Sequence, residues 1–398
     1  MTRRPTRRAV PLCALLAVLL SGFFLRATSV AHAHTHAGSE HGPQARAANV
    51  RPQAERSPSQ DDTAQGTSLG QMGKDGSLSD VAGLSAGDVW AVGQGNAWDM
   101  WRNRGVILHW NGASWAEIPV RGDATGVSHL RSVAASSPGE VWAVGDGRDG
   151  LPYVAKGSQD GFARVAVPEL RTGDWLGGVA AAGSRVVAVG SRDGHAFMAA
   201  TGGAGEGTVW TSAAGPEGAL YGVALAGRTD GWAVGDSGSA PIAMRLSEDG
   251  WKQVDLPEIK GGFLRDVYAQ SRKRALAVGG VYTGDGGVDP LVLSWDGKRW
   301  TREDPPKRRA DLYGVGGDGD GTFWISGYDP ERPRQGFMLR YDGSHWTTIR
   351  GEDSADERTV RLQAVTRVAD VTMAVGYVLD AKDRYTDLVE KFGPPPAG

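Results

Sequence analysis

Five large polar residues at similar places in repeated segments could together bind and process an anionic substrate. Arg131, Arg265 and Arg361 could surround a substrate carboxylate, and Tyr221 or Tyr313 could supply a nucleophile beside an acidic partner. All five lie at or beside the beginning of apolar segments that we expect to be strands. Arginines at such places are also commonly just solvated. A glycoside hydrolase or lyase is therefore an alternative, and the enzyme interpretation is not the favoured one.

Three tryptophans fall outside the repeats described below and indicate a binding surface: Trp98, Trp101 and Trp175. Exposed tryptophan without a packing role commonly marks an interface or a stacking site. Polar contacts to the same ligand would come from Arg102, His129, Arg131 and Asp174. The alternative is that Trp98 and Trp101 only pack onto their own loop.

Other chemical motifs in the sequence are better explained as turns or tails. The strings GLSAG (83–87) and GDSG (235–238) resemble serine nucleophile motifs, but both fall at predicted hairpins or strand ends. If a signal peptide were cleaved after Ala33, His34 and His36 would form an amino-terminal copper or nickel site, and a solvated tail is the alternative. The predicted fold itself implies no cofactor.

The first 33 residues have the three parts of a secretory signal peptide. Arginines precede an apolar run from Ala9 to Leu25, and Ala31-His32-Ala33 suits a signal peptidase. The run is short for a membrane span, so we expect export to the cell exterior or cell wall, with an uncleaved membrane anchor as the alternative. Cleavage would remove five arginines and the only cysteine, Cys13, and would change the net charge from −3 to −8. The acidic balance argues against a nucleic acid partner.

Residues 34–72 carry few large apolar side chains and show no periodicity, which predicts a disordered tether. Over the whole chain glycine is about twice as frequent as usual, with 59 residues among 398 and no collagen period. A turn-rich chain of this composition is typical of an all-β protein. We place the folded domain at 73–393 and a short tail at 394–398.

A motif of the form Val-Trp-Ala-Val-Gly recurs along the chain and shows how the domain is divided. Its copies end at Gly93, Gly145, Gly190, Gly235, Gly279, Gly327 and Gly376. An apolar stretch lies about ten residues before each glycine, with a polar turn between, which predicts two strands joined by a hairpin. Third and fourth strands follow, as in ILHWNGASW (107–115) and VLSWDGKRW (292–300), where Asn-Gly or Asp-Gly suggests a two-residue turn.

Seven such four-stranded antiparallel units predict a seven-bladed β-propeller. The last unit, from about Leu362, ends after its third strand near Phe392. We expect a short strand within 63–73 to supply the missing outer strand and close the ring, and a three-stranded last blade is the alternative.

The pairing of VWAVG with HWNGxSW resembles the WAVG repeats of exported bacterial propellers, and the WDGxxW hairpins resemble the Asp-box turn of sialidase-type propellers. The resemblance covers residues 77–393 and implies architecture. Proteins of this kind include lectins, adhesion factors, assembly factors and enzymes, so it does not imply one activity.

In a propeller, the loops joining strands two to three and four to one emerge on the same face. In this chain those loops are long and unlike one another, as at 94–105 and 280–290, and we call their face the variable face. Variable loops on a rigid scaffold usually carry recognition. We therefore expect a monomeric, secreted, non-catalytic binding module for a glycan, cell-wall material or an envelope protein. The alternatives are the hydrolase or lyase at the axial channel mouth and a purely structural envelope protein.

Overall fold

The described part of the chain forms β-strands and contains no helix. The computed structural model describes residues 55, 57, 64–69, 71, 75–99, 101–201, 209–353 and 358–393, all within one compact unit, Val50–Gly398. The predicted signal peptide, His34, His36, most of the predicted tether and the tail at 394–398 lie outside these residues.

The strands form seven antiparallel sheets, which we call blades one to seven in chain order. Blade one contains β2 (Ser77–Ser85), β3 (Asp88–Gly95), β4 (Arg104–Trp110) and β5 (Trp115–Glu117). Blade two contains β7 (Val127–Ser137), β8 (Glu140–Gly147), β9 (Pro152–Ser158) and β10 (Gly161–Arg164), and β6 (Val120–Arg121) adds a parallel edge strand to it. Blade three contains β11 (Trp175–Ala182), β12 (Arg185–Arg192), β13 (His195–Thr201) and β14 (Trp210–Glu217). Blade four contains β15 (Ala219–Gly227), β16 (Asp230–Asp236), β17 (Pro241–Ser247) and β18 (Gly250–Val254).

The remaining blades follow the same order. Blade five contains β19 (Gly262–Ser271), β20 (Arg274–Tyr282), β21 (Val288–Trp295) and β22 (Trp300–Glu303). Blade six contains β23 (Asp311–Gly317), β24 (Phe323–Tyr328), β25 (Gln335–Tyr341) and β26 (Trp346–Asp353). Blade seven contains β27 (Thr359–Val368), β28 (Val371–Leu379) and β29 (Tyr385–Phe392), and its outer strand is β1 (Ala64–Leu69), which lies within the segment expected to close the ring.

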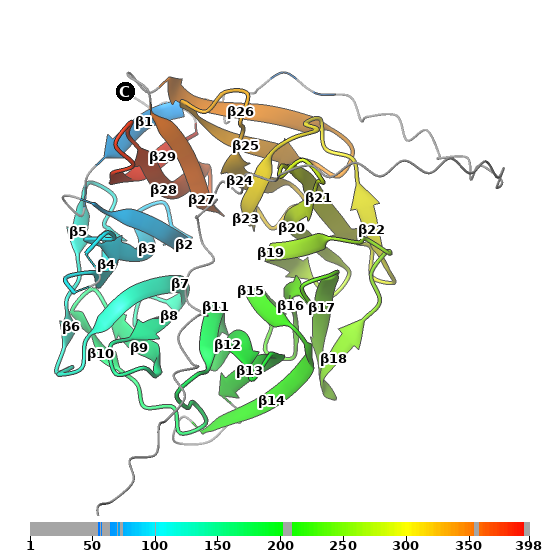
Figure 1. Cartoon of the computed structure of the whole chain (residues 1–398). Helices are drawn as coiled ribbons and strands as arrows, with labels where there is room; N and C mark the ends of the chain where they lie inside the picture. The colour runs from blue at the N-terminus through cyan, green and yellow to red at the C-terminus, as the bar shows by residue number, and fades with distance from the viewer. Residues whose placement is uncertain are drawn as a thin grey trace, which may run out of the picture. The chain divides into compact units, whose positions relative to one another are not determined.

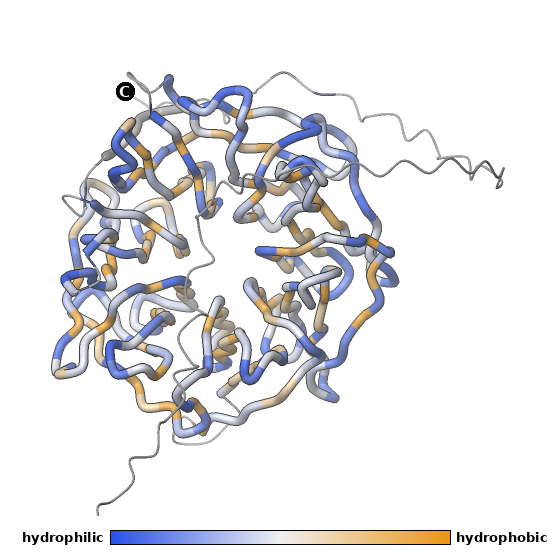
Figure 2. The backbone as a smooth tube through the Cα atoms, in the orientation of Figure 1, coloured by the Kyte–Doolittle hydropathy of each residue, from blue (hydrophilic) through white to orange (hydrophobic). Residues whose placement is uncertain are grey.

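The sheets form the ring of a seven-bladed β-propeller, with the first strand of each blade nearest the axis (Figure 1). Blade one packs on blades two and seven, so the ring is closed. The hydrophobic core lies between neighbouring sheets: Trp90 and Val92 of blade one, for example, pack with Leu130 and Tyr153 of blade two. Hydrophobic residues accordingly recur along the strands, and hydrophilic ones along many outer loops (Figure 2).

One irregularity is repeated in all seven first strands and explains the glycine of the WAVG motif. A β-bulge follows a buried leucine in each blade, at Ser79, Arg131, Gly177, Tyr221, Arg265, Tyr313 and Gln363. The bulge pushes a backbone carbonyl toward the WAVG glycine on the second strand. A Cβ on Gly190 would lie 1.7 Å from the Trp175 carbonyl oxygen, and a Cβ on Gly145 would lie 2.0 Å from that of His129. Only glycine leaves room for this bulge.

The Asn-Gly and Asp-Gly hairpins between the third and fourth strands of blades one, five and six are longer than the sequence suggests. Trp110 pairs with Trp115, so four residues connect the strands where we expected a two-residue turn. Only the glycine of the dipeptide has a positive φ, 95° at Gly112. Asn111 instead accepts hydrogen bonds through Oδ1 from the N–H groups of Ala113 and Ser114, at 3.0 and 2.9 Å. A two-residue turn would need a positive φ at both Asn111 and Gly112. Here the Asn111 side chain caps a longer turn, and only Gly112 has a positive φ.

Candidate binding surface

The repeated bulge brings large polar side chains from several blades to the axial edge of the variable face. Arg131, Tyr221, Arg265 and Tyr313 all occupy the bulge position of their blades. Arg361 lies two residues before the bulge of blade seven, the position that Trp175 holds in blade three. We call these six residues the axial belt. A bulge turns a side chain out of the regular alternation of its strand, which is why the four unlike residues at the bulge hold equivalent places in their blades.

One part of the axial belt joins blades two, three and four. The Arg131 guanidinium lies 5.4 Å from the centre of the Trp175 ring and pairs with Asp146 at 2.6 Å. Trp175 meets Tyr221 edge to face, with ring centres 5.6 Å apart. These contacts hold a half-buried indole in a fixed orientation beside a cation.

The other part joins blades five, six and seven through Tyr313. The Arg265 guanidinium lies 5.1 Å from the ring centres of both Phe263 and Tyr313. Arg361 donates a hydrogen bond to the Tyr313 hydroxyl and lies 3.4 Å from the Asp311 carboxylate. Arg265 is exposed, and no described carboxylate lies within 4 Å of its guanidinium. The structure thus brings Arg265 and Arg361 to one tyrosine, whereas Arg131 contacts Trp175 on another part of the belt.

The belt tyrosines keep their protons at neutral pH. Burial raises the pKa of Tyr221, and the Asp236 carboxylate, which accepts its hydrogen bond, raises it further. Burial also raises the pKa of Tyr313 well above its ordinary value, although Arg361 opposes this shift. Both hydroxyls are therefore suited to donating and accepting hydrogen bonds, and poorly suited to attack as phenolates.

Two of the predicted polar contacts are occupied within the protein. The Asp174 carboxylate, 1% exposed, pairs with Arg192, and the hydrogen bonds from Arg192 hold the pKa of Asp174 below its ordinary value although burial opposes this. His129 is hydrogen-bonded to the Ser79 hydroxyl at 2.9 Å, and burial together with the Arg131 charge lowers the pKa of His129 to about 3.

The loop after β3 presents two tryptophans on the variable face. Trp101 is 83% exposed, and Arg102 beside it is also exposed. Trp98 is 46% exposed and packs on Tyr385 of blade seven, with ring centres 5.2 Å apart, so it reaches across to the next blade and does not pack only on its own loop. Arg148 of blade two donates a hydrogen bond to the Trp101 carbonyl, which fixes the loop from the other side.

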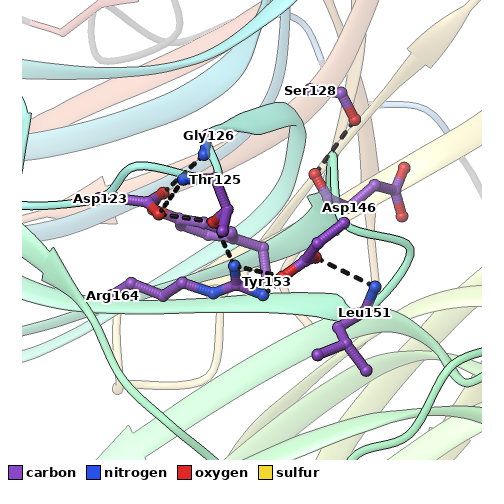
Figure 3. Close-up of polar contacts among 9 residues, drawn as sticks. Asp123, Thr125, Gly126, Ser128, Asp146, Leu151, Tyr153 and Arg164 are labelled. Atoms are coloured by element: carbon purple, nitrogen blue, oxygen red, sulfur yellow. Dashed lines mark hydrogen bonds and ion pairs between the residues drawn. The ribbon is translucent and has the colours of Figure 1, made fainter.

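A polar network beside this loop holds the loops of blade two (Figure 3). Asp123 accepts hydrogen bonds from the N–H groups of Thr125 and Gly126, at 2.9 and 3.1 Å, and from the Tyr153 hydroxyl. Arg164 pairs with Asp149 at 2.7 Å. The variable face is therefore preorganised around blades one and two.

Four residues that contact the belt were not found from the sequence: Asp146, Asp236, Tyr328 and Tyr377. Each directly follows a WAVG glycine, at the end of a second strand. Tyr328 lies under the Arg361 guanidinium, at 4.2 Å from ring centre to carbon, and burial raises the pKa of Tyr377 to about 12. The sequence signal that could have found them is their position directly after the repeated glycine. That position is near the axis because the glycine faces the bulge of the first strand.

The described residues contain neither a metal-binding cluster nor a helix that could cross a membrane. Among the described residues, no group of three or more His, Cys, Asp or Glu side chains could hold a metal ion. None of the described segments forms a helix long and apolar enough to cross a membrane. The predicted metal ligands His34 and His36 lie outside the described residues.

Comparison with known proteins shows the fold. No protein-family model and no curated protein sequence matches the chain. YCF48 bound to a D1 peptide is similar over 86% of this chain and 97% of its own, at 12% identity and a TM-score of 0.56. The WD40 propeller domain of Doa1 is similar over 83% and 98%, at 12% identity and a TM-score of 0.54. The GH74 enzyme of Niastella koreensis is similar over 79% of this chain and 54% of its own, at 12% identity and a TM-score of 0.57. One of these propellers is bound to a peptide, and another belongs to a GH74 enzyme.

Proposed function

We propose that this protein is a binding module whose ligand lies on the axial belt and contacts the loop that carries Trp98 and Trp101. This proposal depends above all on the bulge repeated in every blade, which places Arg131, Tyr221 and Arg265 at equivalent positions of their blades along the axial belt. Arginine and aromatic side chains held in fixed orientations are typical of recognition surfaces. The ligand is a glycan, cell-wall material or an envelope protein.

The contacts of the belt favour binding over catalysis. A hydrolase or lyase using Tyr221 would need that hydroxyl to lose its proton, and burial and Asp236 both raise its pKa. The Tyr221–Asp236 pair is nevertheless the best candidate for the enzymatic alternative. Turnover of any bound saccharide that Tyr221→Phe abolishes without weakening binding would establish it.

The sequence motifs extend the proposal to location and kinship. We place the chain among exported propellers with WAVG and Asp-box-like repeats, acting outside the cell as a monomer. The kinship is supported by a second hairpin with the same side-chain cap. Asp296 accepts hydrogen bonds from the N–H groups of Lys298 and Arg299, at 2.7 and 2.9 Å. The predicted signal peptide is the support for export.

The first test is a binding screen of the mature protein against a glycan array, peptidoglycan and an envelope extract. Trp101→Ala and Trp175→Ala should each weaken binding at least about tenfold, because exposed aromatic anchors commonly carry that much affinity. Trp251→Ala, a half-buried tryptophan on the outer strand β18, is the matched control and should leave binding unchanged. Full binding by a Trp101→Ala, Trp175→Ala double variant that remains folded would refute the site.

A further inference from the structure

An open hollow beside the axial belt indicates what kind of ligand the belt takes. Blades three and four are joined by Gly218 alone between β14 and β15, whereas the corresponding connections at 255–261 and 304–310 are longer. The short connection leaves a hollow of about 280 Å³ on the variable face. Its polar lining comes from Ser191, Glu217, Tyr221, Asp236 and Ser237.

The lining of this hollow suits a ligand with several hydroxyl groups. Asp236 and Glu217 can accept hydrogen bonds, and the hydroxyls of Ser191 and Ser237 can donate or accept them. Trp175 stands edge to face against Tyr221, at 5.6 Å between ring centres, and adds an apolar surface next to these groups. A sugar ring combines neighbouring hydroxyls with an apolar face in this way.

An unpaired cation lies on the other side of Tyr221. Arg265 is exposed, lies 5.1 Å from the centres of the Phe263 and Tyr313 rings, and has no described carboxylate within 4 Å. Its charge also reaches Tyr221, because Arg265 lowers the pKa of that hydroxyl against the larger effects that raise it. A guanidinium that lies near two aromatic rings, with no described carboxylate within 4 Å, is suited to a ligand carboxylate.

We propose that the ligand is an acidic saccharide of the uronic acid type, with its carboxylate on Arg265 and its hydroxyls in the hollow between blades three and four. This inference rests on the proposed binding function and names the ligand class for the same surface. Among the described residues no carboxylate lies within 4 Å of Arg265, so the ligand would supply that group, and the ring would lie between Arg265 and Ser237, against Tyr221.

The test compares oligouronates with their neutral methyl esters by titration calorimetry on the full mature chain. A panel of galacturonate, glucuronate and mannuronate oligomers covers the stereochemistry. We expect at least one free acid to bind about tenfold or more tightly than its ester, because a charge-assisted bidentate pair contributes that much. Arg265→Ala should reduce the affinity for the acid to that for the ester, and Arg265→Lys should restore part of it.

The matched control is Arg299→Ala, an exposed arginine of the same blade on the hairpin between β21 and β22. That hairpin lies on the opposite face, so affinity for the acid should not change. Equal affinity for acid and ester, no binding of any oligouronate, or an unchanged Arg265→Ala variant would each overturn the inference. If a neutral glycan or an envelope protein then bound in a Trp175-dependent way, the proposed function would survive without the acidic ligand.

Discussion

Each WAVG motif must end in glycine because the bulge of the opposing first strand pushes a backbone carbonyl against that position. For Gly145, an added Cβ would lie 2.0 Å from the His129 oxygen and 2.8 Å from the Leu130 Cα. Both are backbone atoms, so the clash can be relieved only by moving β7 away from β8. Gly145→Ala should therefore destabilise the protein by about 3 kcal/mol or more. Urea unfolding followed by tryptophan fluorescence measures the loss.

Gly139 provides the control for this substitution in the same blade. It lies in the turn between β7 and β8, and an added Cβ there would meet no atom within 4 Å. Gly139→Ala should change the free energy of unfolding by less than about 1 kcal/mol. Equal effects of the two variants would show that the bulge does not fix the glycine.

At the scale of elements, closure of the ring depends on β1, a strand distant in sequence from the blade that it completes. Thr67 pairs with Glu390 of β29, so without β1 the edge of blade seven is unpaired. Removing residues 1–70 should lower the Tm by about 5 °C or more and cause self-association, measured by calorimetry and sedimentation. Removing only residues 1–54 keeps β1 and should change neither quantity. A monomeric 71–398 fragment with an unaltered Tm would contradict a closing role.

The elements differ in how well the sequence predicts them, and the reason lies in what each contact requires. The blades follow from the glycine spacing because only glycine tolerates the bulge, which leaves one residue type at each repeat. The hairpin at Asn111 was wrong in length because Asn-Gly suits both a two-residue turn and a capped four-residue turn. The partners of the belt depend on contacts between blades, such as Arg131 on Trp175, which no local pattern records. Asp174 looked available for a ligand because Arg192 pairs with it from 18 residues away.

For the whole molecule, partly buried carboxyl groups between blades connect stability to pH. Asp80 of blade one accepts hydrogen bonds from the Ser132 hydroxyl and the Val133 N–H of blade two, at 2.7 and 2.9 Å. Asp266 of blade five accepts the N–H of Val315 in blade six at 2.8 Å. Burial raises the pKa of Asp80 to about 6, and burial together with the Asp80 charge raises the pKa of Asp266 to about 7. Each carboxylate joins two blades, so its charge state affects the stability of the ring.

The direction of the pH effect follows from these raised pKa values. A carboxyl whose pKa is higher in the folded than in the unfolded chain stabilises the fold most below about pH 4, and that stability is lost as the pH rises through the folded value. Glu390, whose pKa burial raises to about 8, acts in the same direction. Below about pH 4 the opposite effect sets in, because Asp174 and Asp329 have lowered pKa values and lose their arginine pairs when protonated.

The protein should therefore be most stable near pH 4 to 5 and lose stability between pH 5 and pH 8. The slope for each titrating carboxyl is on the order of 1.4 kcal/mol per pH unit. Asp266→Asn keeps an oxygen that can accept the Val315 N–H and removes one titrating group, so its unfolding free energy should fall less steeply between pH 5 and pH 7. Asp249→Asn changes an exposed carboxyl whose pKa is lowered by Lys252, and its slope in that range should match that of the unmodified chain. Urea unfolding at intervals of one pH unit distinguishes these outcomes. Stability that rises from pH 5 to pH 8, or an Asp266→Asn slope equal to that of the unmodified chain, would show that the inter-blade carboxyls do not govern it.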